Sequence, residues 1–276
     1  MRVFVTGATG YIGSEVVREL IDAGHKVIGL TRSEKGALKL KEAGAEVHLG
    51  SLDDLESLRS GGAIADGVIH LAFKHDFSDF AGSLATDLQA IQAIGEVLEG
   101  TGKPFLTTAH ANGTASDNAT LELAKRGVRA SVISLSTSVH GEGDKGFVPR
   151  LINIAREKGF SAYIGDGSNR WPAVHRLDAA RLFRLALEAA PAGSRLDGVG
   201  DEGIPFRDIA TVIGRHLNLP VVSITREQAE AHFGFLGPIA ALDLARSSVQ
   251  TKELLGWKPE NPTLIEDLEQ GHYFEK

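Results

Sequence analysis

A glycine-rich turn near the start of the chain is the first candidate for chemistry. Residues 6–13 read Thr-Gly-Ala-Thr-Gly-Tyr-Ile-Gly, between an apolar run that predicts a strand and an amphipathic pattern that predicts a helix. Glycines let the backbone turn tightly and approach a pyrophosphate, which the N–H groups at the helix N-terminus then bind. We therefore predict a dinucleotide site. The turn residues expected to contact the dinucleotide are Gly7, Thr9, Gly10, Tyr11, Ile12 and Gly13.

The end of the second predicted strand bears on the choice of dinucleotide. An NAD site commonly places Asp or Glu there, to accept a hydrogen bond from the ribose 2′-hydroxyl. This chain instead has Thr31, Arg32 and Ser33. Arg32 can pair bidentately with a 2′-phosphate, and Ser33 can add a hydroxyl donor. We therefore expect NADP(H) to be preferred, with NAD(H) possible; the alternative is that Arg32 is a solvated loop charge.

The elements that must position these residues follow from an alternation of apolar runs and amphipathic stretches. The predicted strands of the first half are 2–6, 26–31, 46–49, 67–73, 104–109 and 129–135. The helices between them include 14–23, 80–98 and 116–126. Such alternation predicts an α/β fold with a doubly wound parallel sheet of the Rossmann type.

Beyond Ser136 the pattern changes to scattered helices and short strands. The predicted elements there are helices over 147–158, 178–189 and 206–217, a strand over 161–164 and a closing helix from Thr263. We therefore expect a dinucleotide-binding Rossmann core over 1–140 and a smaller α/β lobe on the substrate side over 141–276, with some of its elements returning to the core.

Composition and charge exclude several classes of protein. A formal net charge of -7 argues against a nucleic-acid partner, because such a partner needs Lys and Arg clustered on one face. The absence of cysteine excludes a disulfide framework, a thiolate nucleophile and a cysteine zinc site. No histidine or carboxylate cluster has metal-ligand spacing, so no metal is expected, and no Gly-x-Ser-x-Gly elbow indicates a hydrolase.

Hydropathy gives an expectation about location. No apolar run approaches the roughly 20 residues needed to span a bilayer, and Met1 leads into a strand with no signal-peptide pattern. We therefore expect a cytoplasmic protein with no membrane partner that acts on a small molecule.

The turn and four later stretches carry a resemblance to a known family. The G-x-x-G-x-x-G spacing is similar to the fingerprint of the short-chain dehydrogenase/reductase superfamily, in its extended or atypical, epimerase/dehydratase-like branch. Residues 67–72 (Gly-Val-Ile-His-Leu-Ala) resemble the fourth strand of that family. Residues 165–167 and 174–178 resemble its "GDG … VHVDD" stretch, 139–141 its "VYGPG" loop and 254–259 its C-terminal "LGW.P" signature. The resemblance covers almost the full chain.

This resemblance implies further contacts to the cofactor. In the family, the end of the fourth strand flanks the cofactor, and a "GDL" position on the adenine side corresponds to residues 50–53. Ser51 replaces the acid that commonly contacts the adenine there, and Leu52 can pack on the ring. The cofactor contacts implied in this way are Ser51, Leu52, Leu71, Ala72, Phe73 and Thr107.

The catalytic pair of the family is missing. Most members reduce a carbonyl with Tyr-x-x-x-Lys, in which lysine lowers the pKa of the tyrosine that relays the proton. The tyrosines of this chain are Tyr11, Tyr163 and Tyr273, and none stands at the start of the helix predicted near residue 116. The usual proton donor is therefore absent.

Thr108 and His110 are the catalytic candidates that remain. Thr108 ends the fifth strand where the family has its substrate-orienting serine, so its hydroxyl can bind a carbonyl oxygen. An atypical subgroup carries His-x-x-x-Arg in place of the usual pair, and His110 lies close to that position, although Thr114 lies near where the arginine would follow. With an ordinary pKa near 6.5, His110 can donate a proton at neutral pH if it faces the nicotinamide. The alternative is a solvent-exposed loop histidine.

Substrate contacts are expected from the second half of the chain. His140 lies in a loop that borders the substrate cleft in the family, and Arg170 and Trp171 precede a strand that lines it. Arg170 can bind an anionic group; the alternative is that it forms a surface ion pair. For Trp171 the alternative to substrate contact is a position in the core. We expect His175 and Asp178 to form a buried hydrogen-bonded pair with a structural role.

Three functions are compatible with these residues. The leading hypothesis is an NADP(H)-dependent oxidoreductase that reduces a small carbonyl-type substrate. The second is a non-catalytic redox sensor similar to the NmrA-like proteins, in which NADP(H) binding controls a partner. The third is a nucleotide-sugar epimerase or dehydratase, which also normally needs the absent tyrosine. Family habit further implies a homodimer through the helices over 80–98 and 116–126.

Overall fold

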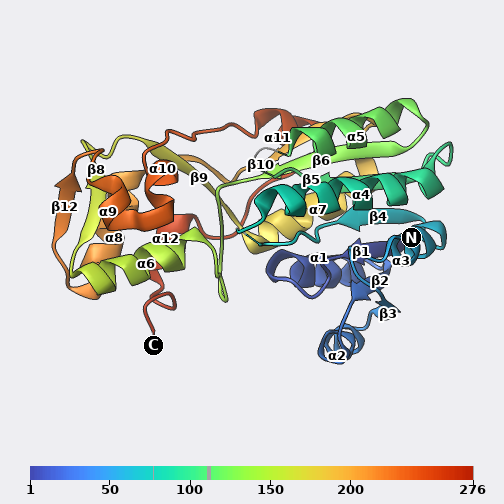
Figure 1. Ribbon diagram of the computed structural model, residues 1–276, viewed down its shortest axis with the longest axis horizontal. Helices are drawn as coiled ribbons and strands as arrows, with labels where there is room; N and C mark the ends of the chain where they lie inside the picture. The colour runs from blue at the N-terminus through green and yellow to red at the C-terminus, as the bar shows by residue number, and fades with distance from the viewer. Residues whose placement is uncertain (77, 111–112, 276) are drawn as a thin grey trace. The chain divides into compact units, whose positions relative to one another are not determined.

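A seven-stranded sheet organises the first half of the chain. The computed structural model describes residues 1–76, 78–110 and 113–275. The strands are β1 (Arg2–Thr6), β2 (Lys26–Thr31), β3 (Glu46–Leu49), β4 (Gly67–His70), β5 (Pro104–Thr108), β6 (Arg129–Leu135) and β10 (Arg195–Gly198). Their order is β10-β6-β5-β4-β1-β2-β3, and neighbours from β1 to β6 pair in parallel (Figure 1). The predicted Rossmann-type fold is confirmed, and the strand order reverses between β1 and β4, where such sheets bind ligands.

Helices cover both faces of this sheet. The helices α3 (Leu55–Ala63), α4 (Phe80–Leu98) and α5 (Thr114–Lys125) pack in sequence on one face, over a core that includes Phe4, Val68 and Phe105. The other face carries α7 (Arg176–Ala189), because a Cβ at Gly67 would meet Leu187, on the face opposite Val68. Glu19 of α1 (Tyr11–Asp22) pairs with Arg184 of α7. The short α2 (Glu34–Glu42) connects β2 and β3.

The chain divides into two compact units. The first consists of Met1–Ser134, Ala179–Leu196 and Gln250–Trp257, and the second of Leu135–Asp178, Asp197–Val249 and Lys258–Lys276. Two segments from beyond residue 140 therefore belong to the sheet-containing first unit. One of them carries most of α7, and the other most of α11 (Val249–Leu255).

The second unit has two small sheets. Strands β11 (Asp201–Pro205), β9 (Arg170–His175) and β7 (Ser138–His140) form one, and β12 (Val221–Ile224) with β8 (Ser161–Ile164) form the other. Its helices are α6 (Phe147–Lys158), α8 (Phe206–Leu217), α9 (Ala229–Phe233), η1 (Gly234–Leu236), α10 (Gly237–Ala240) and α12 (Leu264–Glu269). A capping box between Thr263 and Glu266 starts α12 at the predicted place.

One strand ends earlier than its composition predicts. The apolar run over 67–73 predicts a strand of that length, but β4 ends at His70. The Thr6 hydroxyl accepts hydrogen bonds from the amides of Leu71 and Ala72, at 3.2 Å each; the Leu71 amide also donates to the Thr6 carbonyl oxygen at 3.3 Å, whereas the Ala72 amide bonds to the side chain in place of a strand partner. The chain therefore leaves the sheet beside the glycine-rich turn.

Of the helices that the structure describes, none combines the length and the apolar character needed to cross a membrane.

Candidate functional site

The glycine-rich turn has the backbone geometry that a phosphate site requires. Gly7 has a φ of +69°, and a Cβ there would lie 2.8 Å from the amide nitrogen of Ala72. A Cβ on Gly13 would lie 2.0 Å from the carbonyl oxygen of Gly7, so both positions need glycine. The N-cap of α1 is Gly10, which has no side chain to cap the helix. No capping side chain from Gly10 therefore competes with an anion at the N-terminus of α1, where Thr9, Tyr11 and Ile12 are partly exposed.

Arg32 and Ser33 follow β2 at the same edge of the sheet. Ser33 caps α2, and its hydroxyl oxygen accepts from the amide of Gly36 at 3.1 Å, which leaves the hydroxyl hydrogen free to donate. Arg32 is exposed, and its guanidinium has no ion-pair partner within residues 1–76, 78–110 and 113–275. Contact of Arg32 and Ser33 with a 2′-phosphate stays a prediction.

The segments after β3 and β4 meet at this edge too. Lys74 pairs with Asp53, with 2.5 Å between Nζ and Oδ1, which ties the segment after β4 to the one after β3. Ser51 accepts a hydrogen bond from the amide of Asp53, and Leu52 is half-buried against the core of the first unit. The Lys74–Asp53 pair therefore brings the segment that carries Ser51 and Leu52 next to the segment after β4, and contact of these residues with an adenine stays a prediction.

Beside the turn lies a group of buried polar side chains, here called the His110 cluster. Its members are Thr6 of β1, His70 of β4, Asp87 of α4, and His110, which follows β5. Thr6 Oγ1 lies 2.8 Å from His70 Nδ1, and His70 Nε2 lies 3.2 Å from Asp87 Oδ1. The same carboxylate oxygen lies 3.9 Å from His110 Nε2. The cluster therefore occupies the carboxyl ends of β1 and β4, at the switch point of the sheet.

The environment of His110 sets its protonation. Its side chain is 19 % exposed and stacks on the Phe73 ring, with 4.0 Å between ring centroids. Burial lowers the pKa of His110 to about 4, against the opposing attraction of the Asp87 charge. At pH 7 the ring is mostly neutral, whereas its ordinary pKa would leave a substantial charged fraction.

Asp87 stays charged although it is buried. Burial works to raise the pKa of Asp87, but the hydrogen bonds from His70 and Ser116 and the attraction of His70 and His110 in their protonated forms outweigh it, so the pKa is lowered. A signal for this residue exists in the sequence, because Ser83 and Asp87 continue the helical stripe of Ala90, Ile91 and Ile94 that faces the core. A carboxylate on an apolar helix face needs a buried partner, which this stripe does not identify.

The two threonines that end β5 differ in their surroundings. Thr107 is buried, and its hydroxyl lies 3.1 Å from that of Thr120 on α5. Thr108 is half-buried, and its hydroxyl donates to the carbonyl oxygen of His70 over 3.4 Å. Thr108 thus lies beside the His110 cluster, whereas the hydroxyl of Thr107 is engaged within the core.

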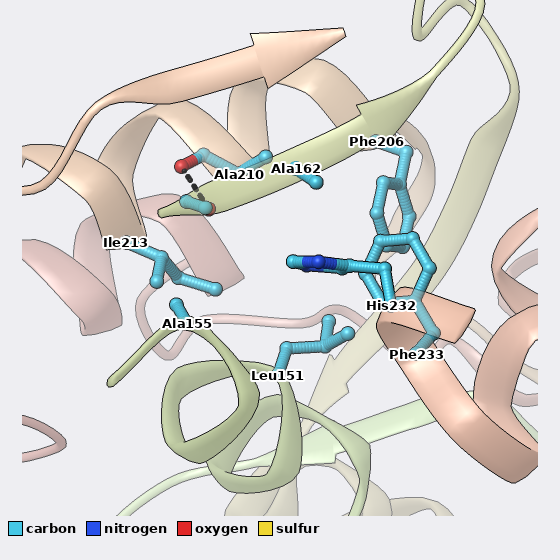
Figure 2. Close-up of a pocket in the computed structure, with 9 residues that line it drawn as sticks. Leu151, Ala155, Ala162, Phe206, Ala210, Ile213, His232 and Phe233 are labelled. Carbon is cyan, nitrogen blue, oxygen red and sulfur yellow. Dashed lines mark hydrogen bonds between the residues drawn. The ribbon is translucent and has the colours of Figure 1, made fainter. Parts of the chain in front are cut away.

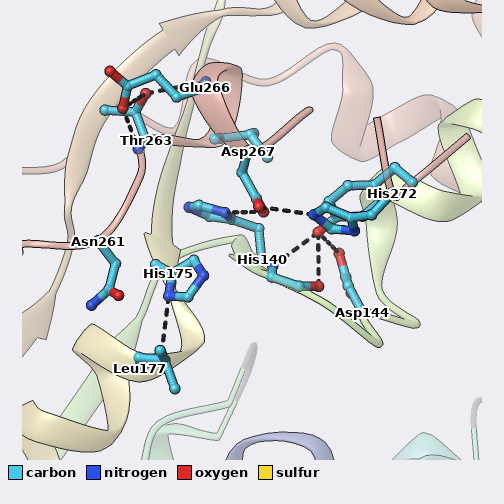
Figure 3. A network of polar contacts seen from close by, with 12 residues as sticks. His140, Asp144, His175, Leu177, Asn261, Thr263, Glu266, Asp267 and His272 are labelled. Atoms are coloured by element: carbon cyan, nitrogen blue, oxygen red, sulfur yellow. Dashed lines mark hydrogen bonds and ion pairs between the residues drawn. The ribbon is translucent and has the colours of Figure 1, made fainter. Parts of the chain in front are cut away.

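A second group of histidines and carboxylates, the His140 cluster, lies in the second unit (Figure 3). Its members are His140, Asp144, Asp267, His272 and Tyr273. Asp267 accepts from both histidines, at 2.8 Å from His140 Nδ1 and 2.9 Å from His272 Nε2. Tyr273 donates to Asp144 at 3.0 Å and accepts from the amide of Gly141 at 3.0 Å. This network holds the C-terminal segment against the loop after β7.

His140 itself is enclosed. It is 1 % exposed, and its Nε2 has no hydrogen-bond partner among the described residues. The ring of His175 stands edge-on to it at 5.3 Å between centroids, and His175 Nδ1 accepts from the amide of Leu177. Asp178 accepts hydrogen bonds from the amides of Glu260 and Asn261. Contact of His140 with a substrate stays a prediction.

Arg170 and Trp171 are placed differently from each other. Arg170 makes a bidentate ion pair with Asp243, and this pair holds the pKa of the Asp243 carboxyl at about 2. It borders an open groove of about 350 Å³ that Arg246 also lines. Trp171 is completely buried between Phe147 and Phe206, in the surroundings of a core residue.

A small, partly open cavity also lies in the second unit, where His232 points between α6 and α8 (Figure 2). Its volume of about 10 Å³ is close to what one water molecule needs, so it is too small for a substrate. Among the described residues, no three His, Asp or Glu side chains are arranged to hold a metal ion.

The chain is similar to several known proteins. The NmrA-like family model matches residues 1–96. An uncharacterized protein of Schizosaccharomyces pombe is 49% identical, over 99% of this chain and 100% of its own length. The 2-alkyl-3-oxoalkanoate reductase of Stenotrophomonas maltophilia is 28% identical over 80% of this chain and 77% of its own.

Among solved structures, the dTDP-glucose 4,6-dehydratase of Streptomyces venezuelae, with NAD bound, has a similar fold. The TM-score is 0.76 at 18% identity, and the match covers 99% of this chain and 97% of that one. Both units of the chain therefore have counterparts in one solved protein.

Proposed function

The chain belongs to the short-chain dehydrogenase/reductase family, in its atypical, epimerase-like branch, and on this basis we propose that it is an NADP(H)-dependent reductase of small carbonyl compounds. The observation that carries the proposal is the position of the His110 cluster, next to the glycine-rich turn at the switch point of the sheet. The similarity to a 3-oxoalkanoate reductase supports a carbonyl acceptor.

The residues present fit a nicotinamide dinucleotide. A glycine turn that cannot accept a Cβ and a helix N-terminus without a capping side chain suit the pyrophosphate. The exposed guanidinium of Arg32 and the free hydroxyl hydrogen of Ser33 suit a 2′-phosphate, which a carboxylate at this place would repel. When bound, the reduced cofactor supplies the hydride.

The protein must then bind the carbonyl oxygen and supply a proton. Thr108 can donate a hydrogen bond to the oxygen, because its present bond to the carbonyl of His70 is long at 3.4 Å. His110 takes the role of the proton donor in place of the missing tyrosine. The stacked Phe73 ring covers one face of His110 and restricts its access to water.

The test is calorimetric titration of the full chain with NADPH and NADH, followed by NADPH oxidation with aldehydes, ketones and quinones. We expect NADPH to bind more tightly than NADH, and Arg32→Ala to weaken NADPH binding about 10- to 100-fold while NADH binding changes little. Lys35→Ala, at an exposed position on α2, is the matched control. Binding of neither cofactor would contradict the proposal.

A non-catalytic redox sensor is the second candidate. The match of residues 1–96 to the NmrA-like family model and the missing Tyr-x-x-x-Lys pair favour it. A sensor would bind NADP(H) with the same dependence on Arg32 but would oxidise no NADPH with any carbonyl. Binding without turnover would therefore support the sensor over the reductase.

A further inference from the structure

We propose that Asp87 holds His110 as the tautomer with hydrogen on Nε2, so that Nδ1 is the ring atom that delivers the proton to the substrate. The tautomer is argued from the contacts alone, and its use in catalysis rests on the proposed function. Asp87 is then a positioning residue, which Thr6 and His70 hold in place.

The first step fixes the hydrogen atoms of Thr6 and His70. The amide of Ala72 donates to Thr6 Oγ1, and the amide of Leu71 is shared between Thr6 Oγ1 at 3.2 Å and the Thr6 carbonyl oxygen at 3.3 Å, so both acceptor sites of the hydroxyl are engaged. Its own hydrogen is left to donate to His70 Nδ1 at 2.8 Å. His70 Nδ1 is therefore an acceptor, so in a neutral ring Nε2 carries the hydrogen and donates it to Asp87 Oδ1.

The second step fixes the charge of Asp87. Its side chain is 1 % exposed, and it accepts a hydrogen bond from His70. Because an ionised carboxylate can only accept, a lone pair on His110 Nε2 would face the same oxygen unfavourably at 3.9 Å, whereas an N–H would be attracted. The titratable groups that act on His110 are Asp87 from α4, His70 from β4 and His75 from the segment after β4, and the two histidines oppose a positive charge on it.

These steps assign the atoms in the reaction. A bound reduced nicotinamide would supply a hydride to the carbonyl carbon and be left oxidised, the electron pair of the C=O π bond would move to oxygen, and that oxygen would take the proton from His110 Nδ1. The His110 ring takes this proton from solvent beforehand and returns to neutral afterwards. Asp87 stabilises the transient imidazolium by charge attraction across the 3.9 Å between Oδ1 and His110 Nε2, in the manner of the aspartate of a Ser–His–Asp triad.

The test is the tautomer of His110, measured at pH 7 by long-range ¹H–¹⁵N NMR on the full chain with ¹⁵N-labelled histidine and no cofactor or substrate. His110→Asn assigns the signal. We expect protonated Nε2 and unprotonated Nδ1 in the wild type, and in Asp87→Asn a shift of the population toward protonated Nδ1. Asp117→Asn, which removes a half-buried carboxylate on α5, is the control and should leave the signal unchanged. A wild-type signal with protonated Nδ1 would overturn the proposal, and this arm depends on no variant folding.

A kinetic measurement distinguishes a positioning role of Asp87 in catalysis from a role in stabilising the fold alone. Above the pKa of His110, we expect kcat/KM for the carbonyl to fall about tenfold per pH unit, and Asp87→Asn to reduce it at least about tenfold at pH 6 with little change in the Kd of NADPH. Equal kcat/KM in wild type and Asp87→Asn would overturn the catalytic part. A wild type without turnover would contradict the proposed function, and the NMR measurement would still decide the tautomer.

Discussion

Each of the two units places an aspartate between two histidines, but the hydrogen bonds from the aspartate to the histidines differ. In the His140 cluster, Asp267 uses one oxygen for each histidine, at 2.8 and 2.9 Å, and Tyr273 extends the network. In the His110 cluster, one oxygen of Asp87 holds His70 and faces His110 at 3.9 Å. The same residue types thus make a closed network in one unit and leave one loosely held histidine in the other. We infer that the closed network stabilises the fold and that the loose histidine does the chemistry.

Removing the loose histidine should give the largest effect on turnover. We expect His110→Asn to lower kcat for carbonyl reduction about 100- to 10,000-fold, because it removes a general acid, with little loss of stability. NADPH oxidation assays measure this. His25→Asn, just before β2 at the opposite end of the strands, should retain wild-type kcat. Full activity of His110→Asn would contradict the assignment of catalysis to the His110 cluster and not to the His140 cluster.

Breaking the closed network should give the largest effect on stability. We expect Asp267→Asn to lower the free energy of unfolding by about 3 to 5 kcal/mol, because the buried His140 and the half-buried His272 lose their charged acceptor. Urea denaturation followed by circular dichroism gives the value. Asp243→Asn, which breaks the exposed pair with Arg170, is the control and should change little. A stable Asp267→Asn with impaired turnover would reverse the two assignments.

The burial of His110 should also be visible in the pH dependence of the free energy of unfolding. Burial lowers its pKa from 6.5 to about 4, so between these values the unfolded chain binds more protons than the folded one. Protonation of His110 in the unfolded chain therefore leaves stability unchanged above pH 6.5 and lowers it progressively as the pH falls toward 4, by on the order of 3 kcal/mol in total. Denaturation from pH 7.5 to 4.5 should show a steeper fall for wild type than for His110→Asn. Parallel curves would mean that His110 is not buried in solution.

The smallest effect concerns the outer part of the closed network. We expect Tyr273→Phe to cost about 1 kcal/mol of unfolding free energy, since it removes the hydrogen bonds to Asp144 and Gly141 and keeps the ring. Thermal unfolding at constant pH measures it, and turnover should stay unchanged. A large loss of turnover in Tyr273→Phe would instead assign this tyrosine a catalytic role.

The fold was most predictable where apolar runs are bounded by turn residues. The predicted strands 2–6, 26–31, 46–49 and 129–135 and the helix 80–98 have the observed bounds. The seventh strand, β10, was not predicted, because Arg-Leu-Asp-Gly has no β-branched residue and no alternation. Its place beside β6 depends on the returning chain, which local patterns do not contain.

The site was predictable only in part, for a similar reason. The turn glycines and Arg32 are recognisable because local spacing alone defines them. Asp87 is 17 residues from its partner His70, and only the packing of α4 on β4 and β5 brings the two together. The lowered pKa of His110 likewise follows from burial by Phe73 and neighbouring segments, not from the residue type.

The most direct test of a reductase is to follow the hydride itself. NADPH carrying deuterium at one C4 position, and separately at the other, would be incubated with the full chain and a panel of small aldehydes and ketones, with His110→Asn in parallel. Mass spectrometry should find deuterium on the carbinol carbon of an alcohol from one of the two labelled cofactors, and much less with the variant. Tight NADPH binding with no deuterated alcohol from either cofactor would contradict the reductase.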